Sequence, residues 1–318
     1  MRIVFMGTPE LAAETLQAVH EKPGVEMRGV LTRPDMPKGR GMKLVPSPVK
    51  EYALAHGIPV FQPKTLRDGA FLPVLKELDP ELIIVAAYGC ILPPYVLEYP
   101  KYGCVNAHGS LLPKYRGAAP IQRALMDGES VTGITAMYMD EGLDTGDMIA
   151  QYPCPIEDSD DGGTLTEKLA RLAGAAMCDV IDAIEAGTLT RTPQPAEGST
   201  YAAKIGREDQ IVDFSAPARA VCCRIRALNP APCAMTALPD GSVLKLTDAR
   251  VADEAADGSA PGTVLLCDGK GEGRIVIACG EGAIAVTGLI PAGKKKMSAG
   301  DFVRGRKIAA GDVLRNPS

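Results

Sequence analysis

The sequence contains no tryptophan, and aromatic residues make up only 4% of its 318 residues. Long apolar runs are also missing: the longest stretch, Leu82 to Leu92, is far below the roughly 18 residues that a membrane-spanning helix needs. No signal-peptide pattern follows Met1, because the short run Ile3–Met6 ends at Gly7-Thr8-Pro9. These absences argue against a membrane protein and predict a cytoplasmic one.

Metal-binding and disulfide patterns are likewise missing. The nine cysteines form no C-x-x-C pair, and the only histidines are His20, His56 and His108. These cysteines and histidines do not show the spacing of a zinc site, and a disulfide scaffold is not expected in so long a chain. We therefore expect reduced, mostly buried thiols, no bound metal, and few candidates for imidazole chemistry.

The first part of the chain alternates strand-like and helix-like segments. Runs typical of strands occur at Arg2–Met6, Val25–Leu31, Val60–Phe61, Leu82–Ala87, Tyr102–His108 and Thr132–Met139. Helical patterns cover Pro9–His20, Pro46–His56, Leu66–Leu78 and Thr164–Ala186. This alternation predicts an α/β fold in which residues 1–187 form a Rossmann-like domain with a mostly parallel sheet.

A chain of 318 residues is longer than a single hydrophobic core usually supports. Its composition and its pattern of predicted elements change after residue 187. Residues 188–203 are rich in Thr, Pro and Gly, which predicts a linker. Beyond it, one helical stretch precedes short strands with turns between them, at Val243–Thr247, Gly262–Cys267, Arg274–Ala278 and Ala283–Leu289. We expect residues 204–318 to form a small β-barrel of the OB type.

Charge is distributed unevenly between these two parts. The net charge of −5 argues against general affinity for nucleic acid. Residues 204–318, however, hold 16 basic and 13 acidic side chains, whereas residues 1–203 carry a net −8. The C-terminal part could therefore meet a polyanion, although this small excess alone proves little.

Polar residues end one of the apolar strands. Asn106 and His108 stand two apart and so share a face, and Ser110 follows across Gly109, where the chain can turn. Ligands of parallel α/β sheets collect at the carboxyl ends of strands, so these groups are well placed for chemistry. The alternative for His108 is a hydrogen-bonded structural histidine.

A loop rich in acids follows the last strand of this series, over Met139–Asp147. Calcium binding is an alternative, but the ligand spacing of an EF-hand is absent. We expect Asp140, Glu141 and Asp147 to be solvated and Asp144 to face His108. An amide, an imidazole and a carboxylate in one cleft supply an oxyanion donor and a proton carrier. Such a set suits direct acyl transfer to an amine.

Basic residues cluster in an otherwise acidic domain. Between Thr32 and Lys50 the single acid Asp35 accompanies five cations, namely Arg33, Lys38, Arg40, Lys43 and Lys50. Such a segment could be only a mobile solvated loop. Its charge and its glycines favour contact with RNA phosphates.

Four motifs resemble the signature of the folate-dependent formyltransferases: Asn106–Pro113, Tyr115–Gln122, Thr132–Thr135 and Gly142–Asp147. The resemblance runs nearly end to end with the members of that family that act on methionyl-tRNA. Arg33–Lys50 resembles the insertion with which those members enter the tRNA acceptor stem. Pro291–Met297 resembles the signature of their C-terminal domain.

The resemblance implies a function and a set of site residues. It makes Asn106, His108 and Asp144 catalytic, 10-formyltetrahydrofolate the co-substrate, and initiator methionyl-tRNA the partner of a monomeric enzyme without a metal. The residues implied for the folate site are Ser110, Leu111, Leu112 and Pro113. Those implied for tRNA are Arg33, Lys38, Arg40, Lys43, Lys294, Lys295 and Lys296.

One departure from the family stands out. Phe214 and Ala231 occupy positions where the family often has tryptophan, so we expect altered packing there but not lost catalysis.

Two alternatives remain open at this point. A formyltransferase for a small amine, such as glycinamide ribonucleotide or an amino sugar, would use the same trio but would need neither the basic insertion nor a second domain. A non-enzymatic RNA-binding protein would leave Asn106, His108 and Asp144 without a role.

Overall fold

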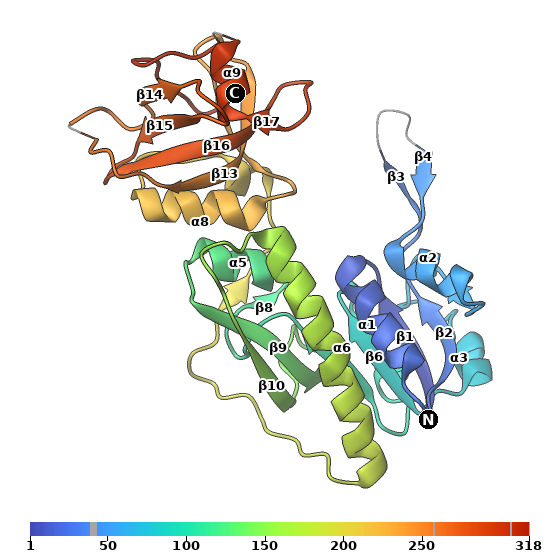
Figure 1. Ribbon diagram of the computed structural model, residues 1–318. Coiled ribbons are helices and arrows are strands. Elements are labelled where there is room, and N and C mark those ends of the chain that lie inside the picture. Colours follow the sequence, from blue (N-terminus) through green and yellow to red (C-terminus); the bar gives the residue numbers. More distant parts are fainter. Residues whose placement is uncertain (39–42, 257, 306, 318) are drawn as a thin grey trace. The chain divides into compact units, whose positions relative to one another are not determined.

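The computed structural model describes residues 1–38, 43–256, 258–305 and 307–317. The chain divides into two compact units (Figure 1). The first comprises Met1–Pro120, Val131–Pro155 and Thr166–Ala202, and the second comprises Ile121–Ser130, Ile156–Leu165 and Ala203–Ser318. In the described part of the chain, no helix is long and apolar enough to cross a membrane.

A seven-stranded sheet forms the centre of the first unit, in the order β10-β9-β7-β6-β1-β2-β5. Five strands are mutually parallel: β1 (Arg2–Gly7), β2 (Glu26–Leu31), β5 (Val60–Phe61), β6 (Leu82–Ala86) and β7 (Cys104–His108). At one edge β9 (Val131–Tyr138) runs antiparallel to β7, and β10 (Met148–Pro155) antiparallel to β9. The predicted α/β fold with a mostly parallel sheet is confirmed.

Helices lie between these strands or follow them in the chain. They are α1 (Glu10–Glu21), α2 (Pro48–Ala55), α3 (Leu72–Leu78), α4 (Pro94–Leu97) and the long α6 (Gly162–Ala186), which begins in the second unit. Close packing of α6 on α1 depends on Gly174, where an added Cβ would lie 2.7 Å from Ala18 Cβ. Helix α3 begins later than the predicted Leu66, because Gly69 has φ +72° and Pro73 suits only a first turn.

Two short pairs of strands stand apart from the main sheet. The hairpin β3 (Met36–Lys38) and β4 (Lys43–Val45) is antiparallel. Strand β8 (Arg116–Gly117) pairs in parallel with β11 (Tyr201–Ala202), which lies at the end of the first unit. The second pair joins segments that are about 85 residues apart in the sequence, as the hydrogen bond from Tyr115 to Thr200 illustrates.

The second unit contains a separate antiparallel sheet, in the order β12-β13-β16-β15-β14 with β17 beside β16. The strands are β12 (Ala234–Ala237), β13 (Val243–Val251), β14 (Val264–Asp268), β15 (Arg274–Ala278), β16 (Ala283–Pro291) and β17 (Met297–Ser298). Its helices are α5 (Pro120–Met126), α7 (Arg207–Gln210), α8 (Ala218–Leu228) and α9 (Ala299–Arg304). Phe214 is buried in the core of this unit, whereas Ala231 is exposed.

The C-terminal segment connects both edges of that sheet. Arg315 pairs with Ala237 of β12, and Val313 pairs with Thr263, immediately before β14. Both contacts are backbone pairs, and the amide of Ala237 donates to the carbonyl oxygen of Arg315 at 2.8 Å. The two edge strands are therefore covered by the same short segment.

An ion pair ties α5 into the second unit. The Arg123 guanidinium makes two hydrogen bonds to the Asp209 carboxylate, at 2.7 and 2.9 Å, and Asp209 also accepts from the amide of Gly206. The Arg123 guanidinium holds the pKa of the Asp209 carboxyl below its usual value. Because both side chains are largely shielded from water, this pair contributes more than an exposed one.

Asp209→Asn should lower the free energy of unfolding at neutral pH by about 1–3 kcal/mol, because it breaks a partly buried charged pair. The pKa of Asp209 is lowered in the folded state, so its stabilisation is complete above the pKa of the unfolded carboxyl, about 3.9. The contribution is lost as the pH falls further, so wild type and variant should converge below about pH 4. Urea denaturation across pH measures both effects.

Asp253→Asn is the control, since it removes an exposed carboxylate from the same unit. Equal unfolding midpoints for wild type and Asp209→Asn at neutral pH would contradict the proposed contribution.

Candidate active site

Strand β7 positions the first two residues of the predicted trio. Every residue of β7 is buried, and the strand lies between β6 and β9. Asn106 is opposite Val85 on one side and Met137 on the other. Because side chains alternate along a strand, Asn106 and His108 point to the same face of the sheet. The sheet thus fixes their backbones firmly.

The two ring nitrogens of His108 have different partners. Nε2 lies 2.9 Å from the carbonyl oxygen of Tyr115, which can only accept, so Nε2 carries a proton. Nδ1 lies 3.7 Å from Asp144 Oδ2, beyond ordinary hydrogen-bond length, and the two groups form an ion pair only when both ring nitrogens carry a proton. The Tyr115 carbonyl therefore orients the imidazole, and the carboxylate faces its second nitrogen.

Asp144 comes to His108 from the loop between the antiparallel strands β9 and β10. Its φ of +52° is the left-handed conformation that only a few residue types adopt readily, aspartate among them. Asp144 Oδ2 accepts a hydrogen bond from the amide of Gly117 at 2.8 Å. The structure thus brings His108 and Asp144 together, with Asn106 on the same face of β7.

The predicted folate segment is built from internal hydrogen bonds. Ser110 is fully buried, and its hydroxyl donates to the carbonyl oxygen of Lys114 at 2.6 Å. The Thr135 hydroxyl donates to Ser110 O and accepts from the amide of Leu112. Leu112 is buried too, whereas Leu111 and Pro113 are partly exposed. Ser110 and Leu112 therefore shape this segment, and its role toward folate stays a prediction.

The basic insertion is partly neutralised by its own acid. Lys50 Nζ lies 2.7 Å from Asp35 and also donates to Gln62. The hydrogen bond from Lys50, and to a smaller extent the one from Gln62, lowers the pKa of the Asp35 carboxyl. Arg33 is exposed and donates to the carbonyl oxygen of Gly89.

The remaining predicted cations of this insertion are not all described. Arg40 and the side chains of Lys38 and Lys43 lie outside the described residues. Their predicted contact with RNA stays a prediction.

The second predicted basic cluster lies in the turn after β16. Lys294, Lys295 and Lys296 are all exposed. Lys296 Nζ forms an ion pair with Asp248 at 2.8 Å, which reduces the charge that it can offer to a phosphate. We therefore expect the three lysines to differ in strength as phosphate ligands.

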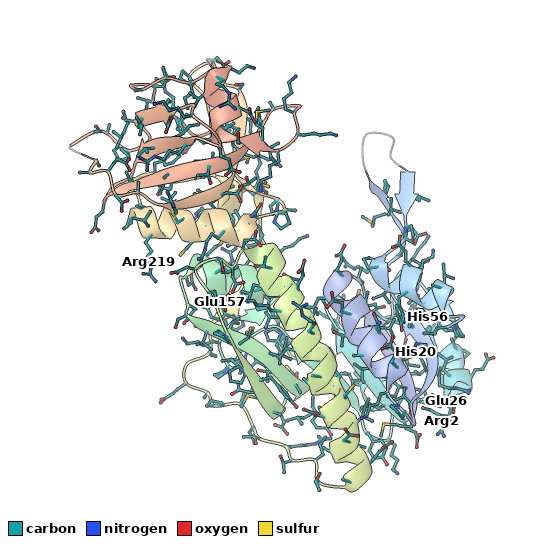
Figure 2. The ribbon with its side chains drawn as sticks, in the orientation of Figure 1. Arg2, His20, Glu26, His56, Glu157 and Arg219 are labelled. Carbon is teal, nitrogen blue, oxygen red and sulfur yellow. The ribbon has the colours of Figure 1, made fainter. Side chains whose placement is uncertain are left out.

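The other two histidines form a cluster of their own (Figure 2). His20 on α1 lies 3.1 Å from the Tyr52 hydroxyl, and His56 at the end of α2 stacks on the Tyr52 ring. The two imidazole rings lie 5.5 Å apart. His108 is thus the histidine that shares a site with Asn106 and Asp144.

The acidic loop gives no support to the calcium alternative. Asp140 accepts from the Thr145 hydroxyl and from the amide of Gly142, so it closes the loop on itself. Across the residues that the structure describes, no group of three or more His, Cys, Asp or Glu side chains is placed to hold a metal ion.

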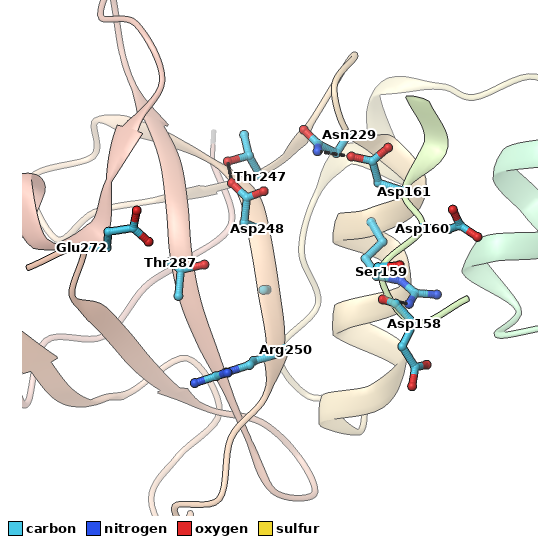
Figure 3. A pocket seen from close by; sticks show the side chains of 12 residues that line it. Asp158, Ser159, Asp160, Asp161, Asn229, Thr247, Asp248, Arg250, Glu272 and Thr287 are labelled. Atoms are coloured by element: carbon cyan, nitrogen blue, oxygen red, sulfur yellow. Dashed lines mark hydrogen bonds between the residues drawn. The ribbon is translucent and has the colours of Figure 1, made fainter. Parts of the chain in front are cut away.

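A pocket of about 400 Å³ lies within the second unit (Figure 3). Carboxylates outnumber the two arginines in its wall, and those acids are Asp158, Asp160, Asp161, Asp248 and Glu272. Asp161 accepts a hydrogen bond of 2.6 Å from the Asn229 amide. Such a wall disfavours phosphates and the carboxylates of a folate, and none of the trio contributes to it.

Residues of the predicted linker support the site, which sequence reasoning missed. Thr200 receives hydrogen bonds from the amides of Tyr115 and Arg116, and the Gln194 side chain contacts both Arg116 and the Asp144 loop. The sequence offered no signal for these contacts, because a Thr-, Pro- and Gly-rich composition is typical of a connecting segment.

Two family models match the chain. A formyl transferase model matches residues 1–181, and a model of the formyl transferase C-terminal domain matches residues 204–307. Together they cover most of both structural units and leave out residues 182–203 and 308–318.

Curated relatives match nearly the whole chain. The methionyl-tRNA formyltransferase of Symbiobacterium thermophilum is 47% identical over 317 residues, which cover 100% of this chain and 96% of the relative. That of Aromatoleum aromaticum is 45% identical over 312 residues, with 98% and 96% covered. An N-formyltransferase of Helicobacter canadensis shares the fold, with a TM-score of 0.64, 18% identity, and 90% and 98% of the two chains covered. The chain belongs to the formyl transferase family.

Proposed function

We propose that this protein transfers the formyl group of 10-formyltetrahydrofolate to the α-amino group of initiator methionyl-tRNA, giving N-formylmethionyl-tRNA. The observation that carries the proposal is the site itself: His108 and Asp144 face each other, with Asn106 on the same strand face, in a formyl transferase fold. The names of the relatives that match the full length of the chain support the tRNA substrate.

The reaction needs a neutral amine and a stabilised oxyanion. An α-amino group titrates near pH 8 in model peptides, so about a tenth or more of it is unprotonated at neutral pH. We propose that this nitrogen attacks the formyl carbon, and that Asn106 and His108 donate hydrogen bonds to the oxygen that becomes negative. Each such donor contributes roughly 10²–10³ in rate in comparable sites.

The contacts of His108 define how it acts. Its Nε2 proton is already donated to the Tyr115 carbonyl, so the nitrogen free to serve the oxyanion is Nδ1. Because a neutral imidazole carries one proton and Nε2 already holds it, donation from Nδ1 requires a second proton, so His108 would act as an imidazolium whose charge faces the Asp144 carboxylate. The Tyr115 carbonyl then keeps the ring in place while the charge develops.

Proton balance gives Asp144 its proposed role. The attacking nitrogen forms the new C–N bond and must lose one proton, while the bond from the formyl carbon to N10 of the folate breaks and N10 gains one. We propose that Asp144 helps move this proton, directly or through a water molecule, and no serine or cysteine nucleophile takes part.

We propose the second unit as a tRNA-binding domain. The segment that joins both edges of its antiparallel sheet supports an OB-type barrel, a fold that suits oligonucleotide binding. Lys294, Lys295 and Lys296 would contact phosphates from this unit, and Arg33, Lys38, Arg40 and Lys43 from the first. All residues of the trio come from one chain, so a monomer suffices.

Formyl transfer by the purified protein tests the substrate. We expect rapid formylation of methionyl-initiator tRNA from 10-formyltetrahydrofolate, and none of free methionine or glycinamide ribonucleotide. Formylation of a small amine with the tRNA ignored would leave the trio in place but overturn the tRNA-binding roles.

Asn106→Ala should lower kcat by about 10²–10³-fold, since it removes one oxyanion donor from a buried site. Single-turnover formylation of methionyl-tRNA measures this loss, and tRNA affinity should stay close to that of wild type. Asn106→Asp is the matched companion, because it keeps the shape but replaces the donor by an acceptor. Near-normal turnover in Asn106→Ala would remove the assignment.

Lys295→Ala should weaken tRNA binding and lower the slope of log KM against log salt by about 0.7–0.9, the value of one phosphate contact. Lys296→Ala should have a smaller effect, because Asp248 already neutralises that ammonium group. Steady-state kinetics from low to moderate salt compare the two variants. A larger effect for Lys296→Ala than for Lys295→Ala would contradict the ranking.

A further inference from the structure

We propose that Gln194 is a positioning residue for the reaction, and that it acts by holding the loop of Asp144. The inference rests on the proposed function, because it takes Asp144 as catalytic. Gln194 lies in the segment before β11 that the sequence predicts as a linker. Among residues 190–198 it is the one side chain that is not exposed.

All hydrogen-bonding positions of the Gln194 amide are used. Nε2 donates to the carbonyl oxygens of Asp144 and Gly146, both at 2.8 Å. Oε1 accepts from the Arg116 guanidinium twice, from Nε at 3.0 Å and from a terminal nitrogen at 2.7 Å. A primary amide offers two donors and two lone pairs, so Gln194 is fully satisfied.

This pattern also fixes which end of the amide faces which partner. If the group were rotated by half a turn, its NH₂ would face the Arg116 guanidinium, which has only donors. Its oxygen would face the two carbonyl oxygens of Asp144 and Gly146, which are only acceptors. The reversed orientation would lose all four hydrogen bonds, so Arg116 locks Gln194 in the orientation that holds the loop.

The loop needs such a restraint. Asp144 has φ +52°, a conformation that an L residue keeps only where its surroundings hold it. Gly117 holds the Asp144 carboxylate at one end, and Gln194 holds its carbonyl at the other. Without Gln194, the carbonyl of Asp144 loses this hydrogen bond while the Gly117 amide still holds the carboxylate, so the 3.7 Å separation from His108 is less firmly fixed.

The contacts close into a ring around the site. Arg116 stands between Tyr115, whose carbonyl binds His108, and Gly117, whose amide binds Asp144. The Arg116 side chain then reaches Gln194, which returns to Asp144. Gln194 therefore couples the position of the carboxylate to the strand segment that also orients the imidazole.

The test is a double-mutant cycle of Gln194→Met and Asp144→Asn, measured by single-turnover formylation. Methionine matches glutamine in size but offers no hydrogen bonds. In the wild-type background, Gln194→Met should lower kcat by about 10–100-fold, the scale of a misplaced catalytic group, with little change in KM for tRNA. In the Asp144→Asn background the same substitution should change kcat less than about twofold.

Gln194→Glu separates the two halves of the amide. Glutamate keeps the acceptor contact with Arg116 and loses both donors, so it should lower kcat as Gln194→Met does. It also keeps the inference testable if Gln194→Met does not fold. Gln17→Met, which alters an exposed glutamine on α1, is the control and should match wild type.

Each outcome decides. Unchanged kcat in Gln194→Met and Gln194→Glu, or an equal loss in both backgrounds, would overturn the inference while leaving the proposed function intact. Normal turnover in Asp144→Asn itself would instead overturn the role of Asp144 and the inference with it.

Discussion

One short stretch of backbone, Tyr115 to Gly117, sets the geometry of the candidate site. Its carbonyl at Tyr115 fixes the imidazole of His108, and its amide at Gly117 fixes the carboxylate of Asp144. The stretch is held in turn by its pairing with β11, where Gly117 is required: with φ +116°, an added Cβ would lie 2.8 Å from Ala202 O. The sheet that carries His108, the loop that carries Asp144 and the segment that ends in β11 therefore meet at these three residues. Catalytic side chains that depend on backbone groups in this way lose little freedom when substrate binds, because their orientation is fixed beforehand.

Charge in this protein is organised locally, and its net value says little. Lys50 is matched by Asp35, and Lys296 by Asp248, so part of the basic clusters is neutralised within the protein. Among the charged side chains that line the pocket of the second unit, five are carboxylates and two are arginines. Asp248 belongs to that pocket wall and pairs with Lys296 at 2.8 Å, so the acidic wall and the basic turn adjoin at this ion pair. A net charge of −5 is thus compatible with binding an RNA through selected lysines.

Sequence patterns predicted the parallel sheet because buried strands are continuous apolar runs, as in β6 and β7, and predicted Asn106 and His108 because polar residues end such a run. Strand β10 was missed. It holds Pro153 and Pro155, which a strand tolerates at an edge, and β10 is the edge of the sheet. The hairpin that brings Asp144 to His108 was therefore also invisible. The sequence also did not predict that residues 121–130 and 156–165 belong to the second unit, because local periodicity does not encode which core a helix or loop joins.

Residues 190–202 form a strap that completes the site, and this strap differs physically from the sheet that carries His108. Strand β7 is fully buried, whereas residues 190–198 are exposed except for Gln194 and are tied down mainly by hydrogen bonds. Segments that bury few apolar groups open at a smaller free-energy cost than the core. The hydrogen bonds from Gln194 to Asp144 and from Tyr115 to Thr200 join residues 50 and 85 positions apart, so they depend on the tertiary structure. It follows that this segment can open while the backbones of Asn106 and His108 stay in the sheet: the sheet secures these two backbones, whereas hydrogen bonds from a distant segment hold Asp144 and support the stretch that orients the His108 ring.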